Sequence, residues 1–189
     1  MNVYDFDGTI YRGDSSLRFY LFCLRHRPSL LGYLPEQILG ILLYKLGCQT
    51  KTEMKSHFFS FLRGIDDVLL QVERFWATEQ HRIEPWYLLQ QKDDDLIISA
   101  SPEFLLRPIC HLKGIQNLIA SQVEPSTGIF LSPNCYGEEK VRQYRSRYGT
   151  SSIEAFYSDS LSDSPMAAQA DKAWLVEKGK LTAWPSNLS

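Results

Sequence analysis

A single strand-like segment at the start of the chain is separated from all other strand-like segments by a long region of helical pattern, residues 13–83. After this region the period changes, and short apolar, β-prone runs at residues 96–99, 117–123 and 153–157 alternate with helical segments. Two hairpin-like exceptions lie at residues 123–131 and 174–184. Such alternation is typical of a parallel sheet joined by crossover helices. The sequence therefore predicts an α/β fold in which a helical region is inserted after the first strand.

The inserted region carries signals for several helices. Apolar residues at helical spacing begin at Leu17, and Pro28 ends this first helix. The residues available to cap its N-terminus are Asp14, Ser15 and Ser16. Thr50 and Glu53 predict a capping box before a later helix. The last helix follows Asp66, and the residues we expect it to bury are Leu69, Val72 and Trp76.

Residues 30–46 are strongly apolar, but polar or helix-breaking residues interrupt them. The interruptions are Pro35, Glu36, Gln37 and Lys45. A helix that spans a bilayer needs roughly 20 uninterrupted apolar residues. We therefore expect a helix over about residues 36–46, ended by Gly47, that is either buried in the cap or lies at an interface. Contact with a membrane surface is the alternative for this segment.

Composition limits the function classes. Hydrophobic content of 44% and charged content of 22% are ordinary for a globular domain, and 189 residues suit one domain with an insertion. The net charge of −2 argues against a nucleic-acid partner. The cysteines, without metal-site spacing, predict no zinc site or disulfide framework; they are Cys23, Cys48, Cys110 and Cys135. The N-terminus leaves no room for an export signal, so we expect a cytoplasmic protein, with peripheral contact at the inner membrane face as the alternative.

Two aspartates, Asp5 and Asp7, follow the first apolar run and precede Gly8 and Thr9, where a strand would give way to a turn. They would therefore lie at the carboxyl edge of the sheet, where open α/β sheets build their active sites. Side chains at i and i+2 share one face of a strand, and Gly8 permits the turn that keeps both near one ligand. Alone, such a pair also occurs in metal-binding transferases and in ordinary acidic turns.

Three further elements follow in order along the chain. An apolar run ends at Ser99, Lys140 lies at a helix start in the sequence Gly-Glu-Glu-Lys, and a second acidic cluster contains Asp159 and Asp163. Together with the first aspartate pair, this order resembles the motif set of the haloacid dehalogenase-like phosphohydrolase superfamily.

The resemblance covers nearly the whole chain and is to the phosphoserine phosphatase-like branch. It implies a Rossmannoid, three-layer core of residues 1–12 and 84–189, with an all-helical cap of residues 13–83. Three core segments look most like the bacterial phosphatidylglycerophosphatase C family: residues 99–103, 117–122 and 137–141.

By this resemblance Asp5 is the nucleophile, and a phosphoaspartyl intermediate divides a difficult displacement into two steps. Asp7 would give a proton to the leaving oxygen and then take one from the attacking water. Crowded carboxylates repel one another unless a cation compensates them, and hard oxygen ligands suit Mg²⁺. The resemblance implies that the Asp5 carboxylate, the Asp7 backbone carbonyl and Asp159 hold Mg²⁺. Asp163 would orient a metal-bound water or Lys140.

The remaining motif residues have alternatives. Ser99 would donate its hydroxyl to a phosphoryl oxygen, and Ser101 is the second candidate for contact with the substrate, although it is also placed to cap the following helix. Lys140 supplies a fixed positive charge, or is one of several solvated cations on its helix. Asp163 could also cap the helix that begins with Ser164 and Pro165.

The motifs leave the substrate open because the cap determines it. A small polar substrate such as phosphoserine would need a carboxylate, for which Asp14 is a candidate, and an arginine. A lipid phosphate, with phosphatidylglycerophosphate as the leading named candidate, would need an apolar surface flanked by cations. The candidates for that surface are Ile38, Leu39, Ile41, Leu42 and Leu43, with Arg25, Arg27, Lys45, Lys51 and Lys55. A phosphotransferase and a non-catalytic module that binds a phosphorylated ligand are the further alternatives.

Overall fold

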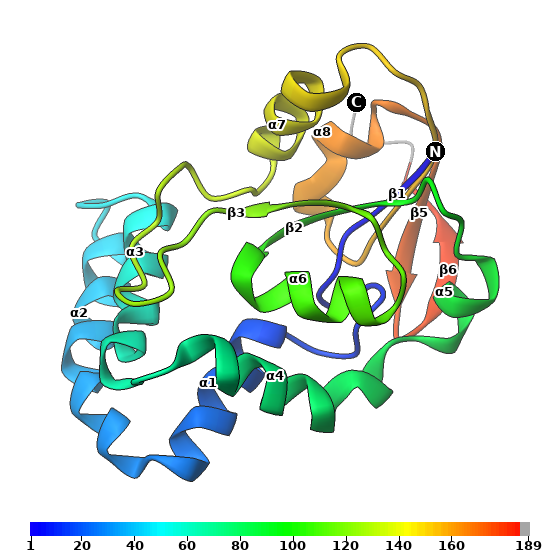
Figure 1. Ribbon diagram of the computed structural model, residues 1–189. Coiled ribbons are helices and arrows are strands. Elements are labelled where there is room, and N and C mark those ends of the chain that lie inside the picture. The colour runs from blue at the N-terminus through cyan, green and yellow to red at the C-terminus, as the bar shows by residue number, and fades with distance from the viewer. Residues whose placement is uncertain (186–189) are drawn as a thin grey trace.

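A six-stranded sheet forms the centre of the computed structural model, which describes residues 1–185 (Figure 1). The strands are β1 (Asn2–Tyr4), β2 (Leu96–Pro102), β3 (Asn117–Ser121), β4 (Ile153–Ser158), β5 (Ala170–Glu177) and β6 (Lys180–Ala183). Their order is β3-β2-β1-β4-β5-β6, and all pairs are parallel except β5 with β6. Because the order reverses at β1, a crevice lies beyond the carboxyl ends of β1, β2 and β4, where such sheets bind ligands.

Helices cover both faces of the sheet, which gives three layers. Figure 1 shows α6 (Glu103–Leu112) on one side of β2 and β3, and α7 (Glu138–Tyr148) with α8 (Ser164–Ala167) on the other. Alternate strand residues enter different cores: Tyr4 and Tyr157 pack on the α6 side, whereas Val3 and Phe156 pack on the α7 side. This two-sided burial explains the near-continuous apolar runs of the inner strands. The predicted α/β fold with a parallel sheet and crossover helices is confirmed.

The chain between β1 and β2 is largely helical, as expected over residues 13–83. Its α-helices are α1 (Ser15–His26), α2 (Leu34–Lys45), α3 (Lys51–Phe58), α4 (Val68–Glu79) and α5 (Pro85–Gln90). Short 3₁₀ segments join them at Pro28–Tyr33, Phe59–Gly64 and Gln80–Arg82. The insertion after the first strand is therefore confirmed.

Local capping signals are found where the sequence indicated them. The Asp14 side chain accepts a hydrogen bond from the Leu17 N–H at 2.8 Å and caps α1. Thr50 and Glu53 form both bonds of the capping box that opens α3. Asp67 caps α4 by accepting the Leu70 N–H at 3.0 Å. Leu69 is 54% exposed, so its expected burial is wrong: it lies on the outer face of α4, and Val68 fills the inner position.

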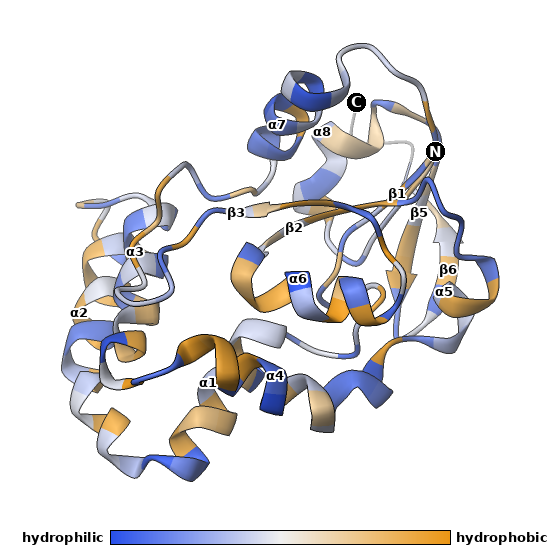
Figure 2. Ribbon diagram, viewed as in Figure 1, coloured by the Kyte–Doolittle hydropathy of each residue, from blue (hydrophilic) through white to orange (hydrophobic). Residues whose placement is uncertain are grey.

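Helix α2 is packed with its apolar residues outward, and Figure 2 shows them as orange turns at the edge of the molecule. Its exposed large side chains include Leu34, Ile38, Leu39, Ile41 and Leu42. Gln37 and Gly40 are buried instead: Gln37 donates to the Phe58 carbonyl at 2.8 Å, and a Cβ on Gly40 would lie 2.5 Å from His57 Cβ. Of the placements expected for this segment, burial of the apolar side chains of α2 is not observed, because α2 approaches α3 through its smallest residue. None of the helices within residues 1–185 has the length and apolarity to cross a membrane.

The inserted helices share a core with the sheet. Aromatic residues on α1 and α4, such as Phe19 and Phe75, belong to the same buried cluster as Tyr4 of β1. Trp76 of α4 also donates its indole N–H to the Leu105 carbonyl of α6 at 2.6 Å. This continuous packing holds the inserted helices over the carboxyl edge of the sheet.

The two expected hairpins differ in the structure. Strands β5 and β6 form the second one, with Lys178 and Gly179 in the turn. At residues 123–131 the chain makes only an isolated bridge between Val123 and Phe130, around a turn. There Gly128, with φ of +78°, lies so close to Phe59 that a Cβ would be 2.3 Å from its carbonyl oxygen. This segment is therefore a loop shaped by contact with the inserted helices.

Candidate active site

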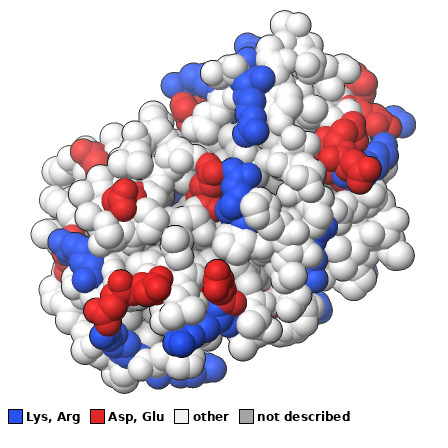
Figure 3. Space-filling view, viewed as in Figure 1, with Lys and Arg blue, Asp and Glu red and all other residues white. Residues whose placement is uncertain are grey.

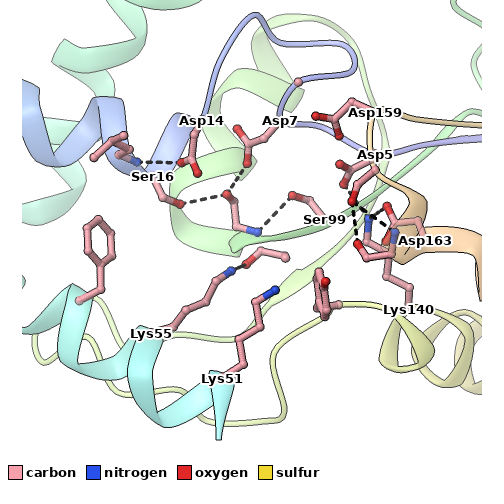
Figure 4. A pocket seen from close by; sticks show the side chains of 18 of the residues that line it. Asp5, Asp7, Asp14, Ser16, Lys51, Lys55, Ser99, Lys140, Asp159 and Asp163 are labelled. Carbon is pink, nitrogen blue, oxygen red and sulfur yellow. Dashed lines mark hydrogen bonds and ion pairs between the residues drawn. The ribbon is translucent and has the colours of Figure 1, made fainter. Parts of the chain in front are cut away.

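Asp5 lies directly after β1 at the carboxyl edge of the sheet (Figure 4). Its N–H donates to the Tyr157 carbonyl at 2.8 Å, which continues the pairing of β1 with β4 to this edge. Its Oδ1 accepts a bond from Lys140 Nζ at 2.7 Å, and Oδ2 has no hydrogen-bond partner within the described chain. Burial raises the pKa of Asp5 to about 7, opposed by Lys140 and reinforced by Asp163. Asp5 thus has one oxygen held and one available.

Lys140 lies in the first turn of α7 and is 2% exposed. Besides Asp5, its Nζ contacts Asp163 Oδ2 at 2.7 Å, and the Ser158 hydroxyl donates to the same oxygen at 2.7 Å. Burial alone would lower the pKa of Lys140, but Asp5 and Asp163 raise it. The alternative of a solvated lysine is therefore wrong. Asp163 does precede α8, yet its carboxylate makes no capping bond there.

Asp159 follows β4 and lies against the loop after β1. Its N–H donates to Thr9 Oγ1 at 3.0 Å. A Cβ on Gly8, whose φ is +72°, would lie 2.0 Å from Asp159 Oδ2, so only glycine permits this approach. The Asp159 carboxylate is exposed at the cavity and forms no ion pair in residues 1–185, and partial desolvation by the surrounding residues raises its pKa. The close approach at Gly8 therefore sets the position of the Asp159 carboxylate at the cavity.

Asp7 is held by two donors. Its Oδ1 accepts the Ser15 N–H at 2.6 Å, and its Oδ2 accepts the Ser101 hydroxyl at 2.5 Å. Burial, with a contribution from Asp14, raises its pKa to about 6, against these hydrogen bonds. A carboxyl group with such a pKa can give and take a proton near neutral pH.

Ser99 and Ser101 are both buried at the end of β2, where the register against β3 shifts. Ser99 Oγ accepts the Ser101 N–H at 3.1 Å. Helix α6 has no side-chain cap, so the expectation that Ser101 caps it is wrong. The irregular strand end directs the Ser101 hydroxyl to Asp7 instead.

A cavity of about 660 Å³ joins these groups to the inserted helices. All the site residues expected from the sequence line it: Asp5, Asp7, Asp14, Ser99, Ser101, Lys140, Asp159 and Asp163. Lys51 and Lys55, candidates for the cations that would flank a bilayer if the substrate were a lipid phosphate, line the cavity from α3 (Figure 4). The only sequence signal for this placement is their i, i+4 spacing after the capping box, which puts them on one helix face.

The donor set fits a magnesium ion. Residues 1–185 contain no group of three or more His, Cys, Asp or Glu side chains placed to hold a metal. The site implied by the resemblance needs only two carboxylates, of Asp5 and Asp159, with the Asp7 carbonyl. The Asp5 carboxylate is buried, whereas Asp159 is exposed at the cavity. Desolvation raises the pKa of both, and within residues 1–185 each keeps one oxygen without a hydrogen bond. A hard divalent cation would compensate this charge.

Residues 3–168 match the family described as haloacid dehalogenase-like hydrolase. The chain belongs to this family. This haloacid dehalogenase-like hydrolase is 31% identical over 112 residues to a histidinol-phosphatase of Neisseria meningitidis serogroup C (strain 8013). The match covers 49% of this chain and 50% of that protein, so it spans about half the length of the relative.

Two solved structures show the same fold. A protein of unknown function from Bordetella pertussis Tohama I superposes with a TM-score of 0.74 and 20% identity, covering 92% of this chain and 87% of that one. A phosphoserine phosphohydrolase-like protein from Francisella tularensis subsp. tularensis SCHU S4 gives a TM-score of 0.58 and 15% identity, over 95% and 88% of the two chains. The hydrolase family with its inserted helices, expected from the motifs, is therefore confirmed.

Proposed function

We propose that this hydrolase cleaves phosphomonoesters by transfer of the phosphoryl group to Asp5. The observation that carries the proposal is the buried carboxylate of Asp5, with Oδ1 bound to Lys140 and Oδ2 free at the cavity. Lys140 keeps Asp5 oriented and partly compensates its charge when an anionic phosphoryl group approaches. Ser99, buried at the end of β2, supplies a hydroxyl beside the same cavity.

Asp7 is proposed as the general acid and base. The Ser15 N–H and the Ser101 hydroxyl fix its carboxylate, and burial raises its pKa to about 6. A proton on Asp7 would pass to the leaving oxygen as the phosphoryl group moves to Asp5. The ionised Asp7 would then take a proton from the water that hydrolyses the phosphoaspartate.

We propose Mg²⁺ as the cofactor, held by the Asp5 carboxylate, the Asp7 backbone carbonyl and Asp159. When bound, the ion would neutralise charge on the phosphoryl oxygens. Asp163, anchored by Lys140 and Ser158, would orient the ligands around it. We also retain residues 13–83 as the cap and residues 1–12 with 84–189 as the core; within that range, residues 186–189 lie outside the described part.

The substrate remains a choice between two classes. The exposed apolar face of α2 favours a lipid phosphate, with phosphatidylglycerophosphate as the leading candidate, hydrolysed by a cytoplasmic protein that contacts the membrane peripherally. Of the five expected flanking cations, however, Lys51 and Lys55 line the cavity, and Arg27 pairs with Asp66. The alternative is a soluble substrate such as phosphoserine or histidinol phosphate, whose ammonium group Asp14 could bind.

Hydrolysis of p-nitrophenyl phosphate tests the proposed chemistry. We expect turnover with Mg²⁺, loss of turnover with excess chelator and recovery on adding Mg²⁺ back. Ca²⁺ should support it poorly, because it prefers longer and more irregular coordination. Full activity in excess chelator would overturn the metal assignment. A phosphotransferase is distinguished by adding an alcohol, which would then appear as the phosphorylated product, and a silent binding module by the absence of any turnover.

Vesicle flotation tests the substrate class. If α2 contacts anionic lipid, Leu42→Glu should reduce both flotation and hydrolysis of a lipid phosphate, with p-nitrophenyl phosphate hydrolysis unchanged. Leu89→Glu is the matched control, since Leu89 is an exposed leucine on α5. Absence of flotation by the native protein would leave a soluble substrate.

A further inference from the structure

Two lysines project from one face of α3 into the cavity, opposite the catalytic carboxylates. Figure 4 shows Lys51 and Lys55 reaching from α3 into the cavity, with Lys55 directed to the end of β2. On the outer face in Figure 3, acidic and basic side chains are interspersed. Within the cavity, by contrast, the two cations are gathered on the side of the inserted helices.

Lys55 is fixed in place but has no ion-pair partner among residues 1–185. Its Nζ donates to the Ala100 carbonyl at 2.8 Å and to Asn134 Oδ1 at 3.1 Å. Both acceptors are neutral, and an ammonium group has three donors, so one N–H remains for a ligand. Burial lowers the pKa of Lys55 to about 8. An anion at this point would relieve the cost of this partly buried charge.

The surrounding contacts hold α3 over the site in one position. Thr52 Oγ1 accepts the Asn134 N–H at 3.1 Å, and Ser56 Oγ accepts the Phe130 N–H at 3.3 Å. Both partners belong to the loop after β3. Lys55 is therefore held between this loop and the end of β2. Its acceptor there, the Ala100 carbonyl, lies between Ser99 and Ser101 in the sequence.

Lys51 lies one helical turn before Lys55 and also lacks an ion pair within the described residues. Its Nζ is 3.2 Å from the centre of the Tyr136 ring, a cation–π contact that orients the ammonium without neutralising it. Asp14 also lines this part of the cavity, but one of its carboxylate oxygens accepts the hydrogen bond that caps α1.

Charge in the cavity is therefore divided. The floor holds four aspartates with Lys140 and the proposed cation, whereas the wall formed by α3 is positive. We infer that Lys51 and Lys55 form a subsite for a second anionic group on the leaving portion of the substrate, a carboxylate or a phosphate. This inference rests on the proposed function and deepens it: the substrate class is a phosphomonoester whose leaving group is itself an anion.

Three soluble phosphomonoesters of similar size test the subsite: 3-phosphoglycerate, with a carboxylate; glycerol 3-phosphate, with a neutral leaving group; and phosphoethanolamine, with an ammonium. We expect the native protein to have the highest kcat/KM for 3-phosphoglycerate. Lys51→Gln and Lys55→Gln should each lower that value about tenfold, with changes below about twofold for glycerol 3-phosphate. Lys51→Arg should retain the preference, and Lys172→Gln, an exposed cation on β5, is the matched control.

The outcomes separate the subsite from the proposed function. Equal losses for all three substrates would mean that the lysines contact the transferred phosphoryl group, and would overturn the inference. Equal kcat/KM values of the native protein for all three substrates would also overturn the inference. If nothing is hydrolysed, the proposed function fails, and calorimetric binding of 3-phosphoglycerate and glycerol 3-phosphate to native protein and Lys51→Gln still decides the subsite. A soluble, short-chain phosphatidylglycerophosphate tests a substrate whose second anionic group is a phosphodiester. A Lys51-dependent preference for it over 3-phosphoglycerate would identify a phosphate as the second anion.

Discussion

Replacing Lys140 by methionine should destabilise the protein strongly, because the ammonium of Lys140 compensates two buried carboxylates at once. Its Nζ lies 2.7 Å from both Asp5 Oδ1 and Asp163 Oδ2, and the lysine is 2% exposed. Methionine keeps an unbranched apolar side chain of similar length. The substitution therefore removes the charge with little change in packing.

The expected loss follows from the burial of the two carboxylates. Removing one partner of a buried ion pair costs about 3–5 kcal/mol, since the remaining charge is left without compensation. For a chain of this length, each kcal/mol lowers Tm by roughly 2–4 °C, so we expect a fall of about 6–20 °C. The burial-raised pKa of Asp5, about 7, should rise further without Lys140.

The pH dependence has a definite sign. A carboxyl group whose pKa is higher in the folded than in the unfolded protein favours folding at low pH, and this advantage is lost as pH rises through the folded pKa. In the presence of chelator, the loss of unfolding free energy for Lys140→Met should therefore be larger at pH 8 than at pH 5.5. Urea denaturation followed by tryptophan fluorescence measures the free energy of unfolding of the native protein and of Lys140→Met at each pH.

Two further variants control this experiment. Lys140→Met combined with Asp163→Asn should be more stable than Lys140→Met alone, because one of the uncompensated charges is gone. Lys172→Met, on the exposed face of β5, should change stability by less than about 0.5 kcal/mol. A cost below about 1 kcal/mol for Lys140→Met, or an equal cost at both pH values, would refute the electrostatic account.

Two other predictions concern the metal site. Gly8→Ala should lower Mg²⁺ affinity at least about tenfold, since its Cβ would displace the Asp159 carboxylate that lies 2.0 Å from that position; unchanged affinity by calorimetry, with circular dichroism confirming the fold, would contradict this. Mg²⁺ affinity should also fall about tenfold per pH unit below pH 7, because a proton competes for Asp5, whose pKa is about 7. An affinity that stays level between pH 8 and pH 6 would show that Asp5 is not a ligand.

The parts of the fold that depend on local chemistry could be predicted from the sequence. The caps at Asp14 and Thr50 depend on bonds to residues three positions away. The gathering of Asp5, Ser99 and Asp159 depends only on the parallel direction of strands whose carboxyl ends meet at one edge. Strand periodicity and turn residues therefore determine most of the site.

The orientation of the inserted helices could not be predicted in the same way. Helix α2 has its apolar side chains outward because Gly40 allows close approach to His57 and Gln37 finds a carbonyl in Phe58, and both are contacts between segments distant in sequence. The same packing turns Lys51 and Lys55 inward. The hydrophobic pattern alone left both a buried and an interfacial placement of α2 open.

Chemical trapping of the phosphoryl group tests the central claim most directly. Asp7→Asn should slow hydrolysis of the intermediate, so incubation with Mg²⁺ and p-nitrophenyl phosphate, followed by acid quench and peptide mass spectrometry, should reveal a phosphate on Asp5. Asp5→Asn should abolish the label and reduce turnover at least about 10³-fold, because it removes the nucleophile and a metal ligand together. A phosphoryl group trapped on any other residue, or turnover that survives Asp5→Asn, would contradict the account.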